Sequence, residues 1–493
     1  MPKAANRAYL AFDLGAESGR AVLGRLQSGV LSINEIHRFA NEPVEYSGSL
    51  HWDIPRLWLE MRRALLRLDK TELSGIGVDT WGVDYALVGE RGELLQNPYH
   101  YRDQRTRGVM EEVFRKIPKE EIYNLTGIQF MPINTLNQLF AAQRDTPELL
   151  KAAKRLLTIP DLFHFWLTGN AVCEFTIATT TQLVSPFTRA WLTGLMERLD
   201  LPSGLPAPIV EPGTVIGQLL PEIGGAGFEN TPVIAPASHD TASAVASVAA
   251  SDGTAFISSG TWSLVGTELH APIVTPEALR CNFTNEGGVA GTTRFLKNVM
   301  GLWMLQRCRQ CWTEQGHGHH YEDLIKLAVD EPAFAHLVDP DEESFLRARD
   351  MPEAIDHFCK LTQQPVPPSP SAYARAILES LALKYRVVVC DLERVTRKSI
   401  EQIRVIGGGS KNRLLNQFTA DATGKTVVAG PMEAAALGNL AVQILATGEA
   451  SSLQEARAIV ERSFATEIFE PRETDRWDAQ MERFRHYTEI TYA

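Results

Sequence analysis

The stretch Ala11–Arg20, AFDLGAESGR, ends an apolar run with an acid and follows it with glycines and an arginine. The apolar residues Ala8–Phe12 predict a buried strand that finishes at a polar edge, at Asp13. Gly15 and Gly19 would let the backbone turn tightly and come close to a ligand. A carboxylate beside a glycine-containing loop could form a binding site for a metal-bound polyphosphate. It equally suits an ordinary hairpin turn with an exposed aspartate.

A second polar turn, Ser238–Thr241, lies between an apolar strand and a helix of small residues. Asp240 stands where its carboxylate can accept a proton from a hydroxyl group, which is what phosphoryl transfer to an alcohol requires. The competing interpretation is that Asp240 or Thr241 simply caps the helix. The two roles are compatible.

A further polar cluster beside apolar residues is KNVMGLWMLQR, Lys297–Arg307. It predicts an amphipathic helix entered through Lys297 and Asn298. Asn298 could bond a sugar hydroxyl and Gln306 a nucleotide, although both are also typical of ordinary polar residues on a helix.

Four glycine-bearing turns each follow an apolar strand: Gly15–Arg20, Trp81–Asp84, Ser258–Thr261 and Gly407–Asn412. Strand ends in an open sheet are common binding places, and backbone N–H groups there can bond phosphate oxygens. The sequence has no GxxxxGK[ST] motif and no GxGxxG after its first strand. Phosphate binding of the Walker type is therefore excluded, and a dinucleotide fold is disfavoured.

Strand-like and helix-like segments alternate along the chain, which predicts an α/β fold. The first expected elements are strands at Tyr9–Asp13, Arg20–Leu26 and Val30–Phe39, followed by a helix over about Ile54–Leu68. Residues 254–269, TAFISSGTWSLVGTEL, repeat the form of LAFDLGAESGRAVLGRL. This echo indicates two halves of similar plan divided near residue 250, with chance similarity of strand–turn units as the alternative.

The composition is that of a soluble globular protein, with 493 residues, 44% hydrophobic and 22% charged, and two or three domains are expected. A net charge of -12 argues against nucleic-acid and anionic-membrane partners. No apolar signal core begins the sequence, and no apolar run is long enough to span a bilayer. Six sparse cysteines favour a reducing compartment, so we expect a cytoplasmic protein.

Taken together, the motifs resemble the FGGY family of carbohydrate kinases nearly end to end. The matching stretches include DLGAESGR, IGVDTWGVDYAL, YRDQRT, ASHDTASAV, SSGTWSLVG, KNVMGLWMLQ and IGGGSKNRLLNQ. The resemblance implies an α/β fold of two actin-like (ribonuclease-H-like) domains flanking a deep catalytic cleft. We therefore expect an N-terminal kinase domain over 1–250 for sugar and phosphate loop, and a C-terminal, nucleotide-binding domain over 251–448. A helical tail over 449–493 is expected to pack back on the N-terminal half.

The resemblance also implies ATP-dependent phosphorylation of L-rhamnulose at O1 to L-rhamnulose 1-phosphate, in L-rhamnose catabolism, with Mg²⁺ as cofactor. By motif, Asp240 matches the general base and Asp13 the residue that holds the metal through water. The implied substrate-binding residues are Gly82, His239, Asp240, Thr241 and Asn298. The implied ATP-binding residues are Ala16, Glu17, Ser18, Gly19, Arg20, Thr261, Gln306 and Gly408. Glu17 departs from the small polar residue of some relatives, and would repel phosphate unless it turns toward the metal or away.

Three alternatives stand beside this interpretation. The chain could be a kinase for another ketose such as L-fuculose, since a few hydrogen bonds read sugar stereochemistry. It could be a non-catalytic sugar sensor, but the presence of both Asp13 and Asp240 disfavours that, because sensing needs neither metal nor base. It could be an actin-like structural ATPase, which the sugar-specific stretches around Trp81 and Asn298 disfavour.

Overall fold

The computed structural model describes residues 7–68, 72–224, 228, 230–249 and 252–491, which form two compact units. The first unit comprises Met1–Ala249, Glu268–Phe295 and Ala434–Phe464, and the second comprises Ala250–Thr267, Leu296–Glu433 and Ala465–Ala493. This division differs from the expected segments 1–250, 251–448 and 449–493. The helices of 434–463 pack within the first unit, whereas the helices after 465 belong to the second, so the expected tail is divided between the two.

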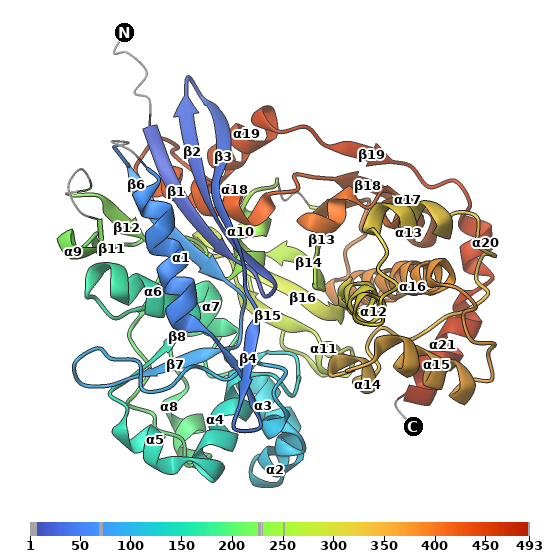
Figure 1. Cartoon of the computed structure of the whole chain (residues 1–493), viewed down its shortest axis with the longest axis horizontal. Helices are drawn as coiled ribbons and strands as arrows, with labels where there is room; N and C mark the ends of the chain where they lie inside the picture. The colour runs from blue at the N-terminus through green and yellow to red at the C-terminus, as the bar shows by residue number, and fades with distance from the viewer. Residues whose placement is uncertain (1–6, 69–71, 225–227, 229, 250–251, 492–493) are drawn as a thin grey trace. The chain divides into compact units, whose positions relative to one another are not determined.

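The first unit is built on a mixed sheet in the order β11-β12-β6-β1-β2-β3. These strands are β1 (Arg7–Leu14), β2 (Ser18–Gln27), β3 (Val30–Ala40), β6 (Gly75–Thr80), β11 (Val215–Gln218) and β12 (Pro232–Ile234). β1 pairs antiparallel with β2 and parallel with β6, which in turn pairs parallel with β12. The three N-terminal strands expected from the sequence are confirmed with slightly wider bounds, and they lie side by side in Figure 1.

Helices and short strands complete the first unit. The helices are α1 (Ile54–Leu66), α2 (Val109–Lys116), α3 (Lys119–Thr126), α4 (Thr135–Asp145), α5 (Pro147–Ala152), α6 (Ile159–Thr168), α7 (Phe175–Thr179), α8 (Thr193–Arg198), α9 (Pro221–Gly224), α10 (Asp240–Ala246), α11 (Pro276–Arg280), α18 (Ala434–Ala446) and α19 (Leu453–Ser463). The short strands are β4 (Pro43–Tyr46), β5 (Ser49–Trp52), β7 (Tyr85–Val88), β8 (Arg155–Thr158), β9 (Cys173–Glu174), β10 (Ile209–Val210) and β15 (Thr284–Gly287). The helix expected near Ile54–Leu68 is confirmed as α1, which Asp53 caps by accepting from Arg56 N.

Helix α18 supplies much of the first unit's core although it lies far along the chain. Its Leu437 and Leu440 pack with Tyr9 of β1 in one buried apolar cluster. It also packs closely on α10, where a Cβ on Gly438 would overlap the carbonyl oxygen of Ser243. The absence of a side chain at Gly438 therefore sets the separation of α10 and α18.

The second unit repeats the same strand plan. Its strands follow the order β16-β14-β13-β17-β18-β19, with β13 antiparallel to β14, parallel neighbours β17 and β18, and an antiparallel β19. They are β13 (Thr254–Ser259), β14 (Trp262–Leu269), β16 (Thr293–Met300), β17 (Gln402–Ile406), β18 (Thr426–Ala429) and β19 (Glu467–Phe469). The internal echo read from the sequence is thus a repeat of topology.

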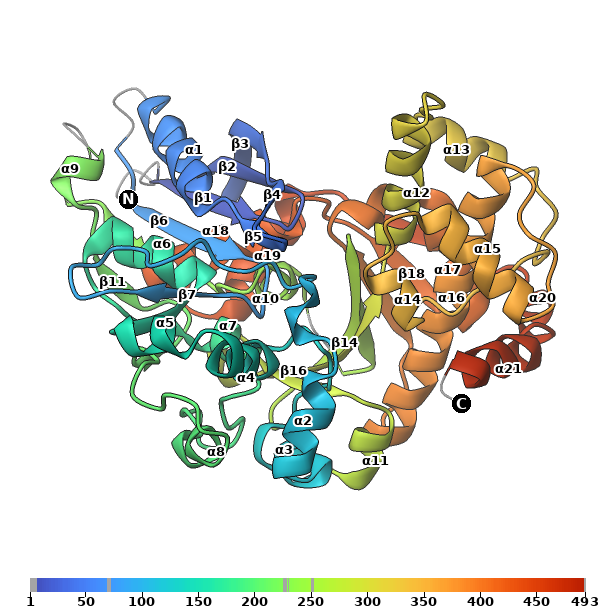
Figure 2. The ribbon, with the colours of Figure 1, turned by 60° about the horizontal axis from the view of Figure 1, so that its bottom comes forward.

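The helices of the second unit centre on the long α16. They are α12 (Trp303–Glu314), α13 (Tyr321–Ala328), α14 (Glu343–Leu346), α15 (Met351–Leu361), α16 (Pro370–Thr396), α17 (Arg413–Thr423), α20 (Thr474–Asp478) and α21 (Met481–Thr491). Ser369 caps α16 by accepting from Ala372 N, and the apolar stripe from Ala374 to Val388 is buried, so α13 and α17 pack on it (Figure 2). Among the described helices, none is long and apolar enough to cross a membrane.

One local expectation is wrong. Lys297 and Asn298 lie on strand β16, and the helix begins only at Trp303. Gly301 makes the turn between them, because a Cβ there would lie 2.6 Å from the carbonyl carbon of Trp262.

The contact at Gly438 predicts a large stability effect from one methyl group. Gly438→Ala must force α10 and α18 apart, and we expect it to destabilise the protein by about 1–3 kcal/mol. Gly194→Ala is the matched control, since Gly194 lies on α8 with no atom within 4 Å of its added Cβ, and it should be neutral or slightly stabilising. Urea unfolding of both variants tests this, and equal midpoints would refute the role assigned to Gly438.

Candidate active site

Three aspartates lie at one edge of the first unit's sheet. The parallel register of β1 and β6 places Asp13 opposite Asp79. The chain that leaves β12 passes β6, where Thr80 N donates to Ser238 O over 2.9 Å, and then reaches Asp240. Because the carboxyl ends of parallel strands meet at one edge, this is where an open α/β sheet binds its ligands.

The predicted phosphate loop is a hairpin between β1 and β2. Gly15 N donates to Ser18 O over 3.0 Å, and Asn41 holds the turn by donating from Nδ2 to Gly15 O (2.8 Å) and from its backbone N to Glu17 O (2.9 Å). The Glu17 side chain is exposed. Only the residues from 15 to 17 form the turn itself, since β2 begins at Ser18.

Residues Gly19 and Arg20 of this motif have contacts of their own on β2. A Cβ on Gly19 would overlap the ring of Phe39, so the glycine is required by packing. Arg20 Nη2 lies 2.6 Å from Asp13 Oδ2, and its Nε lies 2.9 Å from the same oxygen. Asp13 is therefore buried and paired, unlike the exposed turn aspartate of the simpler interpretation.

Asp79 is a site residue that the sequence analysis missed. It is 0% exposed, and Asn439 Nδ2 of α18 donates to its Oδ2 over 2.6 Å. Burial, and then the neighbouring Asp13 carboxylate, raise the pKa of Asp79 well above its usual value. The signal was present, because Asp79 ends its apolar strand in the same way that Asp13 does.

Asp240 begins α10. Its Oδ1 accepts from Thr241 N and from Thr241 Oγ1 (3.1 Å), and it lies 3.5 Å from His239 Nε2. Within the described chain, the hydrogen bonds to this carboxylate all reach Oδ1. His239 occupies the N-cap position without a side-chain capping bond, and Asp240 in the first turn accepts from Thr241 N, so a contribution to helix capping stays compatible with a role in catalysis. Although its side chain is 30% exposed, burial of the carboxyl group raises the pKa of Asp240.

Gly82 lies directly beside His239. A Cβ on Gly82 would come within 3.3 Å of His239 Nε2 and of the Thr180 side chain. The turn that carries Gly82 is fixed at Asp84, whose Oδ2 accepts from the indole N–H groups of Trp52 (2.6 Å) and Trp81 (3.0 Å). Burial raises the pKa of Asp84 to about 6 despite these donors.

A buried carboxylate supports the segment before Asp240. Glu174 Oε2 accepts from Ser238 N (3.0 Å) and from Thr176 Oγ1 (2.6 Å). Thr176 Oγ1 in turn accepts from His239 N over 3.2 Å. Burial raises the pKa of Glu174 to about 8, while its hydrogen-bond donors act in the opposite direction. The backbone N–H groups of Ser238 and His239 therefore donate to the side chains of Glu174, the N-cap residue of α7, and of Thr176 in α7.

The predicted residues of the second unit lie around the ends of β13, β16 and β17. Thr261 O accepts from Gly301 N (3.1 Å) and Trp303 N (3.2 Å), which ties the SSGT turn to the start of α12, the helix that carries Gln306. Gly408 follows β17, and a Cβ on it would meet nothing within 4 Å, whereas one on Gly409 would overlap Ser259 Oγ. Asn298 belongs to this unit, while Gly82, His239, Asp240 and Thr241 belong to the first.

Two sequence profiles match the chain. The FGGY family of carbohydrate kinases, N-terminal domain, matches residues 8–246, and the same family's C-terminal domain matches residues 255–447. The chain therefore belongs to the FGGY family of carbohydrate kinases, and it is a sugar kinase with ATP as co-substrate.

Within that class, the chain is similar to rhamnulokinases. It is 44% identical over 482 residues to the rhamnulokinase of Bacteroides thetaiotaomicron, which covers 97% of this chain and 99% of the relative. It is 40% identical to the rhamnulokinase of Bacillus subtilis, over 95% of this chain and 96% of the relative.

Solved structures confirm the fold. A gluconate kinase from Lactobacillus acidophilus superimposes with a TM-score of 0.80 at 17% identity, over 99% of this chain and 98% of that chain. A Plasmodium falciparum glycerol kinase crystallised with ADP gives 0.75 at 16% identity, over 99% of each chain. The expectation of a two-domain α/β kinase fold is therefore confirmed.

The space at Gly408 predicts a selective effect on nucleotide binding. Gly408→Val should fold normally, because its Cβ meets open space, and should weaken ATP binding about 10-fold or more, which is ~1.4 kcal/mol. Gly204→Val, which also meets open space, is the control and should bind ATP normally. Calorimetric titration measures both affinities, and a folded Gly408→Val protein with unchanged ATP affinity would contradict the placement of the nucleotide.

Proposed function

We propose that this sugar kinase transfers the γ-phosphoryl group of ATP to O1 of L-rhamnulose, giving L-rhamnulose 1-phosphate in L-rhamnose catabolism. The similarity to rhamnulokinases over nearly the whole chain supports this substrate. The observation that carries the proposed chemistry is the arrangement of Asp240, which is partly exposed at the sheet edge and whose hydrogen bonds from the described residues reach Oδ1.

Asp240 is the proposed general base. Its Oδ2 would accept the proton of the O1 hydroxyl as that oxygen attacks the γ-phosphorus and the bond to the ADP oxygen breaks. Burial raises the pKa of Asp240, which makes its carboxylate a stronger base than that of an ordinary aspartate. Gly82, His239, Thr241 and Asn298 are the proposed sugar contacts, and proximity and alignment supply most of the remaining acceleration.

The ATP contacts are proposed from the same motifs. Ala16 to Arg20 would lie along the phosphates, and Thr261, Gln306 and Gly408 along the rest of the nucleotide. Glu17 is exposed in the turn between β1 and β2, and its part in the phosphate loop stays a prediction. Arg20, held on Asp13, would place one positive charge beside them.

The carboxylates fit a magnesium ion. Asp13, Asp79 and Asp240 lie at one sheet edge, where the charges of Asp13 and Asp240 add to burial in raising the pKa of Asp79, and a divalent cation would offset negative charge there. Among the described residues, no three acids, histidines or cysteines form a metal-binding group. Asp13 would hold the hydrated ion, and Mg²⁺ when bound would neutralise charge on the phosphates.

We also propose that the enzyme acts in the cytoplasm on small molecules. All six cysteines are free thiols, and five of them are buried, which suits a reducing compartment. The net charge of -12 supports sugar and ATP as its partners rather than nucleic acid or membrane.

A ketose panel tests the substrate. With ATP and Mg²⁺, coupled ADP release should give the highest kcat/KM on L-rhamnulose, and the product should carry phosphate on O1 by phosphorus–carbon coupling in NMR. A higher kcat/KM on L-fuculose would replace the proposed substrate, and sugar binding without ADP release would favour a sensor.

Replacement of the proposed base gives a second test. Asp240→Asn keeps the shape and one acceptor but cannot take a proton as a carboxylate does, so kcat should fall by about 10²–10⁴-fold. In the parent enzyme, activity requires ionised Asp240 and should decrease as pH falls through a pKa above the ordinary aspartate value. The decrease at acid pH that belongs to Asp240 should be absent from the residual activity of the variant.

Asp53→Asn is the matched control for Asp240→Asn. Asp53 caps α1 by accepting from Arg56 N over 3.2 Å, so the change keeps a cap and should leave kcat unchanged. If a folded Asp240→Asn enzyme, checked by thermal melting, behaves like Asp53→Asn, then Asp240 is not the base.

A further inference from the structure

Arg294 is a buried cation that the mechanism above does not use. It lies at the start of β16, in the part of that strand up to Phe295 that belongs to the first unit, is 0% exposed, and its Nε donates to Gly287 O over 2.8 Å. Its Nη2 lies 3.0 Å from Glu286 Oε2 and 3.1 Å from His239 Nδ1. Removing a guanidinium group from water costs several kcal/mol. We therefore asked what the buried Arg294 does beside His239.

The chemistry of the three groups restricts the proton on His239. A guanidinium group only donates hydrogen bonds, so the imidazole nitrogen that faces Arg294 must accept. Nδ1 is then unprotonated, and the ring proton is on Nε2. Glu286 Oε2 lies 3.2 Å from the same Nδ1 and is the acceptor that would hold a proton there if Arg294 did not occupy it.

The other ring nitrogen faces the proposed base. Nε2 lies 3.5 Å from Asp240 Oδ1, and a Cβ on Gly82 would come within 3.3 Å of it. With its proton on Nε2, His239 presents a donor toward this region. That donor adds to the two from Thr241 on the side of Oδ1, which keeps Oδ2 as the oxygen that accepts the substrate proton.

We propose that Arg294 is a positioning residue that fixes His239 as the neutral Nε2–H tautomer, by donating to Nδ1 in competition with Glu286. His239 thereby offers a hydrogen-bond donor to Asp240 and to the sugar. The expected effect of Arg294 on kcat rests on the proposed function, whereas the assignment of the His239 tautomer does not.

The tautomer is measured directly by NMR on the full-length enzyme labelled with ¹⁵N-histidine. His239→Gln assigns the signals by removing them. The two ring nitrogens should show an unprotonated Nδ1 and a protonated Nε2 in the parent protein. A proton on Nδ1 would overturn the proposal without any variant of Arg294, so the test does not depend on whether such a variant folds.

Arg294→Met removes the donor but keeps the length of the side chain. The proton should then move to Nδ1, where Glu286 accepts it, and an unchanged tautomer would overturn the proposal. With L-rhamnulose as substrate we expect kcat to fall about 10- to 100-fold, which is the usual effect of removing a residue that orients an active-site side chain. The KM for ATP should be unchanged. Arg294→Lys should restore part of kcat, because it keeps one donor.

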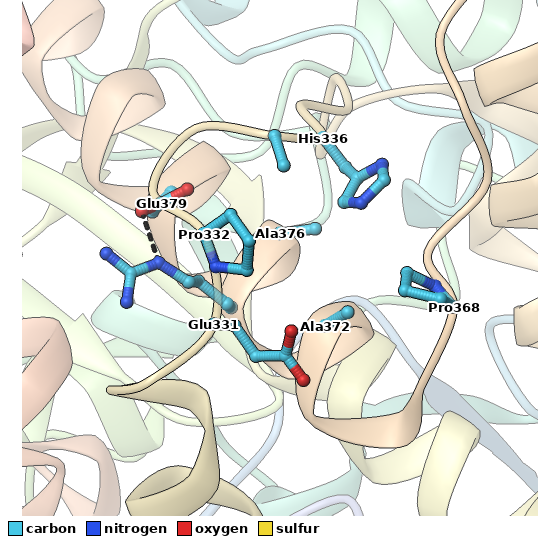
Figure 3. Close-up of a pocket in the computed structure, with 9 residues that line it drawn as sticks. Glu331, Pro332, His336, Pro368, Ala372, Ala376 and Glu379 are labelled. Carbon is cyan, nitrogen blue, oxygen red and sulfur yellow. Dashed lines mark hydrogen bonds and ion pairs between the residues drawn. The ribbon is translucent and has the colours of Figure 1, made fainter.

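Arg375→Met is the matched control in the second unit. Arg375 Nε donates to buried Glu379 Oε1 over 2.8 Å, beside a pocket of about 100 Å³ that Glu331 and His336 also line (Figure 3). Its loss removes a comparable ion pair and should change neither kcat nor the His239 signals. If the parent enzyme phosphorylates no ketose, the proposed function fails, and the NMR result still decides the role of Arg294.

Discussion

The parallel pairing of β1 with β6 is the constraint on which the site depends. Its register sets Asp13 opposite Asp79, and the parallel neighbour β12 delivers Asp240 to the same edge. Burial and, after it, the repulsion from the neighbouring Asp13 carboxylate raise the pKa of Asp79. Arg20 on Asp13 and Asn439 on Asp79 offset part of that repulsion, so the neighbouring strand and helix are selected by charge as well as by packing.

The second unit uses the same strand order with a different electrostatic character. Near the end of β1, Asp13 stands opposite Asp79, whereas near the end of β13, Ser258 stands opposite Ile406 of β17. Its turns present glycine and hydroxyl groups, and Gly408 leaves open space. One topology thus carries an edge with paired aspartates in the first unit and an edge without them at the corresponding strand ends of the second.

Much of this plan was predictable from the sequence, because strand ends, turns and the internal echo are local patterns. Asp79 could have been recognised as a strand-final acid like Asp13. The pairing of Arg294 with His239 and the return of α18 to the first unit could not, since both depend on contacts between distant segments that no periodicity records. Asn298 was assigned to a helix because its apolar neighbours fit a helical stripe, and the close packing at Gly301 ends the strand there instead.

The hydrogen bond from Asn439 to Asp79 joins residues 360 positions apart. A ribosome adds residues from the N-terminus, so Asp79 is made long before its buried partner exists. During that interval the first unit lacks α18 and the apolar side chains that α18 contributes to its core. The acidic edge can therefore reach its final form only after most of the chain has been synthesised.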